Sequence, residues 1–118
     1  MLQVLLVDDD PAQLRIRELI LRNAGMVVHI ATNVDSALAF MRTMGDKIGV
    51  VVTDHVLPGR TGVELVREIR LFAPSLPVYV LSGMPGIEGE YDGLNVSVHL
   101  KPFPPEQFIR EIQSALAA

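Results

Sequence analysis

Short apolar runs alternate along the chain with longer stretches in which apolar residues recur every three or four positions. Apolar runs bounded by turn residues are typical of buried strands, whereas the wider spacing is typical of amphipathic helices. We therefore predict five strands, which lie at 4–7, 26–31, 49–54, 77–83 and 95–102. Helices are expected after the first, second, third and fifth of these strands.

The alternation of strands and helices predicts an α/β fold with a parallel sheet covered by helices on both faces. We expect a flavodoxin-like, doubly wound sheet of five strands in the order 2-1-3-4-5. In such a sheet, ligands bind beyond the carboxyl ends of the strands, where the strand order reverses. The length of 118 residues suits one domain, so we take residues 1–118 as a single unit.

The ends and faces of the helices can be predicted in part. Pro11 suits the first turn of the first helix, where a backbone N–H is not required, and Gly25 ends that helix. Thr32 is expected to cap the second helix, in the sequence TNVD. The expected buried face of the first helix consists of Ala12, Ile16, Leu19, Ile20 and Ala24.

The segment between the fourth and fifth strands departs from the pattern. Residues 83–95 read GMPGIEGEYDGLN and contain four of the nine glycines, together with Pro85. Glycine and proline are the poorest helix formers. We therefore expect the fourth helix to be reduced to one or two turns or to be absent.

Composition narrows the classes of function. The net charge of −4 provides no basic surface for nucleic acid. The chain contains no cysteine, which excludes disulfides, zinc–thiolate sites and cysteine nucleophiles. No apolar run approaches the roughly 18 residues of a membrane span. We expect a cytoplasmic domain that contacts neither nucleic acid nor a membrane directly.

Polar residues stand at the carboxyl ends of four predicted strands. In chain order they are Asp8–Asp10, Asp54, Ser82 and Lys101. Each of them alone suits an ordinary role, such as a helix cap, a turn or a solvated charge. Because the carboxyl ends of parallel strands share one edge of the sheet, their joint position predicts one small cleft.

The residue types in this cleft favour phosphoryl chemistry. Several carboxylates raise one another's pKa unless a cation balances them, and a small set of oxygen ligands suits Mg²⁺. A lysine and a serine hydroxyl suit phosphate oxygens. Together these groups would stabilise a transferring phosphoryl group, and the nearest carboxylate would be the nucleophile that forms an acyl phosphate.

Four segments, in order, resemble those of the response regulator receiver domains of two-component signalling. They are LLVDDD (5–10), VVTDHVLPGRTG (51–62), VLSG (80–83) and KPF (101–103), and the resemblance extends over the whole chain. It implies a Mg²⁺-dependent phosphoacceptor that receives a phosphoryl group from a sensor histidine kinase or a histidine phosphotransfer protein. Such a domain acts as a conformational switch rather than as an enzyme. The second segment is also similar to that of receivers in hybrid sensor kinases.

The resemblance implies a role for each acidic residue. Asp54 would be the phosphoacceptor and a metal ligand. Asp9 would bind Mg²⁺ directly, Asp8 would act mainly through water, and the backbone carbonyl of Val56 would be a further ligand. Asp10 stands where receivers often have another polar residue, so we expect it to cap the first helix.

The remaining polar residues match the part of the family site that binds the phosphoryl group. Ser82 stands where receivers have a Thr or Ser that moves toward this group. Lys101 matches the lysine that binds it, and the Lys101–Pro102 bond is typically cis in the family.

Two features depart from the family pattern. Val98 stands where receivers commonly have a Tyr or Phe whose ring reorients on phosphorylation. The interval from Ser82 to Lys101 is also shorter than is typical. We hypothesise that phosphorylation of Asp54 is instead read through ordering of residues 83–95.

Two other interpretations are open at this stage. The pair Asp8 and Asp10 resembles the nucleophile and acid/base of haloacid-dehalogenase-type phosphatases, in which Asp8 would be the nucleophile. Alternatively, a degenerate receiver would serve only as a protein-binding module, although the complete set of polar residues argues against this. The three histidines lack metal-like spacing and are interpreted as incidental; they are His29, His55 and His99.

Overall fold

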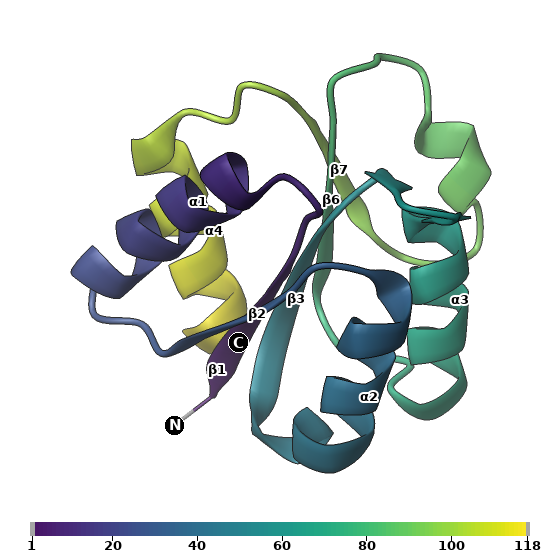
Figure 1. The fold of residues 1–118 in the computed structure, drawn as a ribbon, viewed down its shortest axis with the longest axis horizontal. Coiled ribbons are helices and arrows are strands. Elements are labelled where there is room, and N and C mark those ends of the chain that lie inside the picture. The colour runs from purple at the N-terminus through teal and green to yellow at the C-terminus, as the bar shows by residue number, and fades with distance from the viewer. Residues whose placement is uncertain (1, 118) are drawn as a thin grey trace.

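Five parallel strands form the central sheet of this computed structural model, which describes residues 2–117 (Figure 1). The strands are β1 (Gln3–Val7), β2 (Val28–Ala31), β3 (Ile48–Asp54), β6 (Val78–Ser82) and β7 (Ser97–Leu100). Their order is β2-β1-β3-β6-β7, and every neighbouring pair is parallel. Because β6 and β7 are the fourth and fifth strands of this sheet, the predicted order and the doubly wound fold are confirmed.

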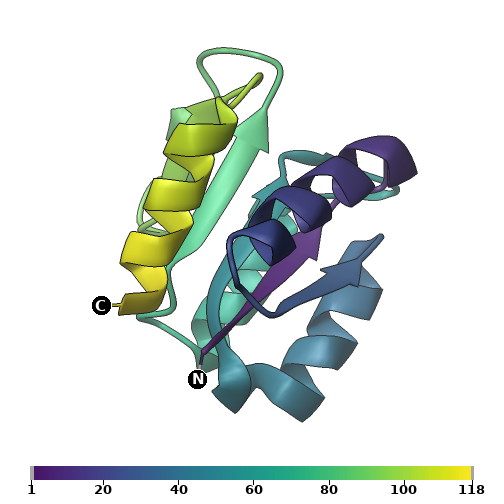
Figure 2. The same ribbon diagram turned by 90° about the vertical axis from the view of Figure 1, so that its left-hand side faces the viewer.

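Helices cover both faces of the sheet. On one face lie α1 (Pro11–Asn23) and α4 (Pro105–Ala117), which Figure 2 shows from their own side. On the other face lie α2 (Val34–Met44) and α3 (Gly62–Phe72), and the 3₁₀ turn η1 (Gly45–Lys47) leads from α2 into β3. Within residues 2–117, none of the helices has the length and apolar character that a membrane span requires.

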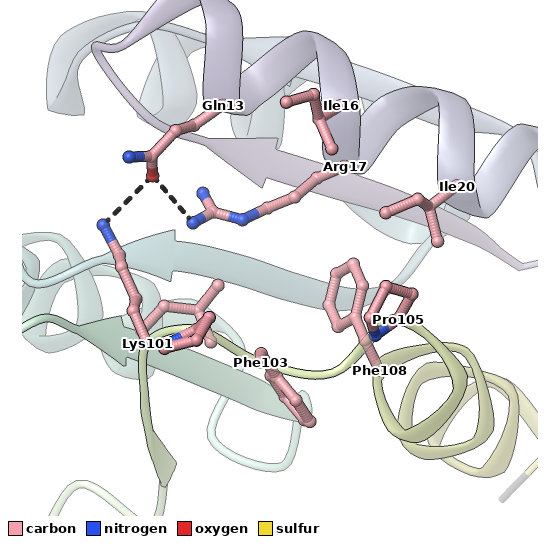
Figure 3. Close-up of a pocket in the computed structure, with 10 residues that line it drawn as sticks. Gln13, Ile16, Arg17, Ile20, Lys101, Phe103, Pro105 and Phe108 are labelled. Carbon is pink, nitrogen blue, oxygen red and sulfur yellow. Dashed lines mark hydrogen bonds between the residues drawn. The ribbon is translucent and has the colours of Figure 1, made fainter.

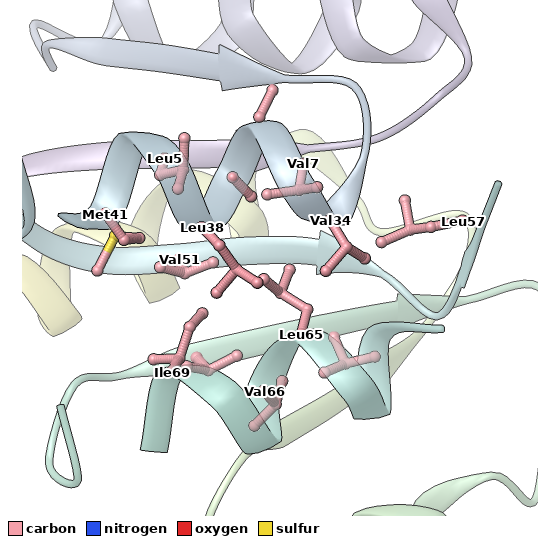
Figure 4. Packing of buried hydrophobic residues seen from close by; sticks show 14 of the residues in the cluster. Leu5, Val7, Val34, Leu38, Met41, Val51, Leu57, Leu65, Val66 and Ile69 are labelled. Atoms are coloured by element: carbon pink, nitrogen blue, oxygen red, sulfur yellow. The ribbon is translucent and has the colours of Figure 1, made fainter. Parts of the chain in front are cut away.

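The middle strand, β3, is buried along its whole length. Val50 and Val52 pack in the core beneath α1 and α4. Val51 packs in the core beneath α2 and α3, which also contains Leu38 and Ile69 (Figure 4). A strand covered on both faces is apolar at successive positions, which explains the unbroken run in the sequence. The last residue of this strand, Asp54, therefore lies at the carboxyl-terminal end of the sheet.

The buried face of α1 differs from the predicted one. The residues that it buries are Leu14, Glu18 and Leu21. Of the predicted residues, Ile16 and Leu19 are 58% and 41% exposed and Ala12 is also exposed. Ile20 is partly buried and packs against the core, as predicted. Glu18 is tolerated on the inner face because Arg15 and Arg22 hold its carboxylate at 3.0 and 3.1 Å. Because Glu18 is charged, the spacing of apolar residues does not identify the inner face of α1.

The caps of the first two helices are both side-chain oxygens. Asp10 caps α1 as predicted, because its carboxylate accepts hydrogen bonds from two backbone N–H groups of the first turn. The cap of α2 is Asn33, whose Oδ1 accepts a hydrogen bond from the Ser36 N–H at 2.8 Å. The prediction of Thr32 is therefore wrong by one residue, and asparagine is the stronger N-cap of the two.

The connection from β3 to α3 contains a small hairpin. β4 (Val56–Leu57) pairs antiparallel with β5 (Arg60–Thr61). The guanidinium of Arg60 binds one carboxylate of α2 and two of α3. The loop after Asp54 is thereby attached to both helices on that face.

Residues 83–95 contain a single 3₁₀ turn, η2 (Glu88–Tyr91), and no α-helix. This confirms that the fourth helix is reduced. The turn packs on the core through Ile87 and Tyr91, which are 5% and 3% exposed. The segment therefore contains little helix, but its two buried side chains attach it to the core of the domain.

Gly62, the first residue of α3, provides a test of this close packing. A Cβ atom at this position would lie 2.6 Å from the Tyr91 hydroxyl and 2.7 Å from the carbonyl oxygen of Asp54. We predict that Gly62→Ala lowers the free energy of unfolding by about 1–3 kcal/mol, because neighbouring atoms must move. Urea unfolding measures the change. Gly89→Ala is the matched control, since no atom lies within 4 Å of a Cβ there; equal effects of the two substitutions would contradict the prediction.

Candidate functional site

Three carboxylates meet at the carboxyl ends of β1 and β3. Asp8 and Asp9 follow β1, and Asp54 ends β3. One oxygen atom from each of these residues lies within 4.8 Å of the others. The two strands are neighbours, and the order of the sheet reverses between them, which is where a doubly wound sheet binds its ligand.

Lys101 adds a positive charge at the same edge. It follows β7, and its Nζ lies 3.1 Å from Asp54 Oδ1. The Lys101–Pro102 peptide bond is cis. The structure thus brings together residues from the first, third and fifth strands of the sheet.

A second cation, Arg17, is absent from the residues predicted from the sequence. Its Nη1 donates hydrogen bonds to Asp8 Oδ2 at 2.6 Å and to Asp54 Oδ1 at 3.4 Å. Long side chains on a helix point back toward its N-terminus, so Arg17 reaches the site from the second turn of α1. In the sequence, Arg17 is visible only as a charged residue about two helical turns after the aspartates. Its role can be predicted only when the inner face of α1 is known.

Gln13 connects the two cations. Its Oε1 accepts hydrogen bonds from Arg17 Nη2 at 3.0 Å and from Lys101 Nζ at 3.4 Å (Figure 3). These polar groups lie at one end of a cavity of about 500 Å³ beside α1, whose other walls include the apolar side chains of Ile20 and Phe103. The cations therefore have open space next to them.

The two buried aspartates differ in pKa. Burial, together with the hydrogen bond and charge of Asp8, raises the pKa of Asp54 to about 7, against the opposing effect of Arg17 and Lys101. Burial also acts to raise the pKa of Asp8. However, hydrogen bonds with Asp54, with the Asp10 N–H and with Arg17 outweigh burial, and the pKa of Asp8 is lowered. In the metal-free site the pKa values of the two neighbouring carboxyls therefore shift in opposite directions.

Ser82 ends β6 at the same edge, with its hydroxyl directed to the following loop. Its Oγ donates a hydrogen bond to the Met84 carbonyl at 2.8 Å and accepts one from the Met84 N–H at 3.0 Å. To contact a phosphoryl group, as the family resemblance implies, this hydroxyl would have to leave Met84. Val56 lies two residues after Asp54 on β4, and the role of its backbone carbonyl as a metal ligand stays a prediction.

His55, interpreted from the sequence as incidental to metal binding, connects the loop after Asp54 to residues 83–95. The buried imidazole Nδ1 lies 2.8 Å from the Tyr91 hydroxyl, and Nε2 lies 3.6 Å from Glu90 Oε2. His55 directly follows Asp54, and Tyr91 belongs to η2. The hydrogen bond between His55 and Tyr91 therefore joins the loop after Asp54 to residues 83–95, which connect β6 to β7.

The donor set fits a small divalent cation. Asp8, Asp9 and Asp54 offer only oxygen atoms, which Mg²⁺ prefers, and Mg²⁺ usually retains several waters. Asp9 is exposed, so water can reach this side of the site. A bound divalent cation would also offset the repulsion among the carboxylates.

The family model of the response regulator receiver domain matches residues 4–113. The chain belongs to this family. The receiver domain is 30% identical over 116 residues to the probable transcriptional regulatory protein TcrX of Mycobacterium tuberculosis and to the cell cycle response regulator CtrA of Brucella ovis. Each alignment covers 96% of this chain but 49% of the relative. The chain therefore spans about half the length of these proteins.

Solved receiver structures are similar over nearly the whole domain. The chemotaxis response regulator CheY4 of Vibrio cholerae has a TM-score of 0.85 at 27% identity, with 98% of this chain and 99% of that chain covered. A response regulator receiver protein of Sinorhizobium medicae has a TM-score of 0.86 at 28% identity, with 99% and 95% covered. The described part of the receiver domain thus has the fold of its family.

The raised pKa of Asp54 leads to a testable pH dependence of stability. Between the ordinary value of 3.8 and about 7, the folded metal-free domain holds a proton that the unfolded chain has lost. Its stability therefore falls as pH rises through this window. Asn resembles the protonated acid, so Asp54→Asn removes this loss. In EDTA we predict that Asp54→Asn raises the melting temperature more at about pH 8 than at about pH 5.

Scanning calorimetry of the two proteins at both pH values measures this difference. Asp46→Asn, at an exposed position on η1, is the control for removal of one negative charge. A gain for Asp54→Asn that is the same at both pH values would show that the buried carboxyl does not behave as described.

Proposed function

We propose that this receiver domain accepts a phosphoryl group from a phosphohistidine donor onto Asp54 in a Mg²⁺-dependent reaction. The observation that carries the proposal is the position of Asp54, which ends the buried central strand within 4.8 Å of the oxygens of two other aspartates and 3.1 Å from Lys101. Nucleophile, metal-ligand carboxylates and phosphate-binding cation are the groups that phosphoryl transfer to a carboxylate requires.

In the proposed transfer, an oxygen of the Asp54 carboxylate attacks the phosphorus atom. The new O–P bond forms as the N–P bond to the donor histidine breaks. The electron pair of that bond stays on the imidazole, which takes up a proton, and Asp54 becomes an acyl phosphate. Mg²⁺, held by Asp8, Asp9 and Asp54, would supply positive charge to the phosphoryl oxygens and keep Asp54 ionised.

Lys101 lies where it can bind the transferred phosphoryl group. Its ammonium is already 3.1 Å from the nucleophilic carboxylate, and a lysine acts toward phosphate oxygens as a compact charge. Ser82 would add a hydroxyl donor once it leaves the Met84 backbone. Lys101 and Ser82 would then stabilise the negative charge on the phosphoryl oxygens in the transition state.

The proposed partner is a sensor histidine kinase or a histidine phosphotransfer protein. Its histidine has to enter beside Asp54, and the neighbouring surface of α1 is suited to a protein partner. Ile16 is 58% exposed and lines the cavity next to Arg17 and Lys101, so an apolar side chain beside the charged site is available for contact with a protein partner.

Mass spectrometry after incubation with Mg²⁺ and a small-molecule acyl phosphate tests the site. We predict that the wild type gains one phosphoryl group, that Asp54→Asn gains none, and that Asp8→Asn gains far less than the wild type. Asp10→Asn is the matched control, because Asp10 caps α1. Labelling of Asp54→Asn combined with loss in Asp8→Asn would instead support the haloacid-dehalogenase-type mechanism with Asp8 as nucleophile. A wild type that takes no label would favour a binding module without phosphorylation.

The signal of phosphorylation is proposed to pass to residues 83–95 in the absence of an aromatic ring at Val98. Two contacts support this route. Ser82 holds the start of the segment through Met84, and His55 holds its 3₁₀ turn through Tyr91. A phosphoryl group that attracts the Ser82 hydroxyl and moves the loop after Asp54 would alter both contacts and so bias the conformation of the segment.

Removal of the Tyr91 hydroxyl tests this route. We predict that Tyr91→Phe leaves phosphorylation of Asp54 intact but reduces the amide NMR shift changes that beryllofluoride with Mg²⁺ produces in residues 83–95. The free energy of unfolding should fall by about 0.5–1.5 kcal/mol, as for one lost hydrogen bond. Tyr79→Phe is the matched control, since the Tyr79 hydroxyl donates to the Glu111 carbonyl away from this segment. Equal shift changes in wild type and Tyr91→Phe would count against the route.

A further inference from the structure

The guanidinium of Arg17 lies against two of the carboxylates that a metal ion would use. Its Nη1 is 2.6 Å from Asp8 Oδ2 and 3.4 Å from Asp54 Oδ1. The contact is shielded from water, because the side chains of Arg17, Asp8 and Asp54 are 16%, 1% and 7% exposed. Ion pairs with this little exposure are much less screened than surface pairs.

Both oxygens of Asp8 have partners in this arrangement. Oδ2 accepts from Arg17, and Oδ1 accepts from the Asp10 N–H at 2.9 Å. A Mg²⁺ ion that uses Asp8, whether directly or through water, therefore competes with the guanidinium for the same carboxylate. Mg²⁺ and Arg17 are both positive, so they also repel each other across the site.

We propose that Arg17 is a resident cation that binds Asp8 and Asp54 in the metal-free receiver and that Mg²⁺ has to displace. Arg17 is then a positioning residue that sets the affinity for the metal. The inference rests on the proposed function, since it assumes that these carboxylates hold Mg²⁺. It adds that this chain carries its own competitor for the metal site.

The surroundings of Arg17 allow the displacement. Its Nη2 already donates a hydrogen bond to Gln13 Oε1 at 3.0 Å, at an exposed position (Figure 3). The side chain also lines the cavity of about 500 Å³, whose walls include Ile16, Ile20 and Phe103. The guanidinium can therefore turn away from Asp8 toward Gln13 and the cavity while its aliphatic stem stays against apolar side chains.

The test is a Mg²⁺ titration of the metal-free receiver, followed by isothermal calorimetry or amide NMR. We predict that the dissociation constant for Mg²⁺ is about tenfold lower in Arg17→Met than in the wild type, because the competitor is gone. Arg67→Met is the matched control. It removes the same charge from an exposed position on α3, and its dissociation constant should stay within about twofold of the wild type.

Thermal unfolding supplies a second readout that does not depend on phosphorylation. In EDTA, Arg17→Met should melt at a lower temperature than the wild type, because the carboxylates lose their cation. Added Mg²⁺ should then raise its melting temperature by more than it raises that of the wild type. If Arg17→Met does not fold without metal, Arg17→Gln, which keeps a polar side chain of similar reach, takes its place in both measurements.

The outcomes separate this inference from the proposed function. Equal or weaker Mg²⁺ binding by Arg17→Met, in a wild type that binds Mg²⁺, overturns the inference alone. The same tightening in Arg67→Met also overturns it, because the effect would then come from net charge. If neither the wild type nor Arg17→Met binds Mg²⁺, both the inference and the metal dependence of the proposed function are wrong.

Discussion

The repulsion among Asp8, Asp9 and Asp54 is the constraint on which the rest of the site depends. Their oxygens lie within 4.8 Å of one another, and two of the three residues are buried. Such a cluster is stable only with compensating positive charge or bound protons. The structure supplies both: Lys101 and Arg17 pair with the carboxylates, and the pKa of Asp54 is raised to about 7. A site that needs cations in this way is suited to a divalent metal and to a group that carries negative charge.

The sheet makes this crowding possible. β3 is buried along its whole length, and its packing on two cores fixes the place of Asp54. β1 lies beside it in parallel register, so Asp8 has little freedom to move away. The residues 83–95, by contrast, are held by Ile87, Tyr91 and a few hydrogen bonds. Two of these hydrogen bonds come from Ser82 and His55, which lie at the same end of the sheet as Asp54, so they join the segment to the site.

Several features were outside the reach of sequence patterns. The inner face of α1 contains Glu18, so its apolar spacing pointed to Ile16 and Leu19 instead. The contact of Arg17 with Asp8 depends on which face of α1 is turned toward the sheet, and that face was predicted incorrectly. His55 and Tyr91 are 36 residues apart, and no periodicity relates them. In each case the deciding factor is the direction of a side chain in a packed structure, which neighbours in the sequence do not specify.

The sequence by itself determined the order of strands and helices, the strand order of the sheet, the shortened segment at 83–95 and the polar residues at the strand ends. These follow from periodicity, from glycine and proline content and from the geometry of parallel sheets. The tertiary structure alone decided which cation contacts which carboxylate, that Ser82 binds the Met84 backbone, and that His55 meets Tyr91. The physical reason is that local periodicity specifies the strands and helices, and right-handed crossovers leave few strand orders for a parallel sheet. These contacts depend instead on the directions of side chains that come from distant elements.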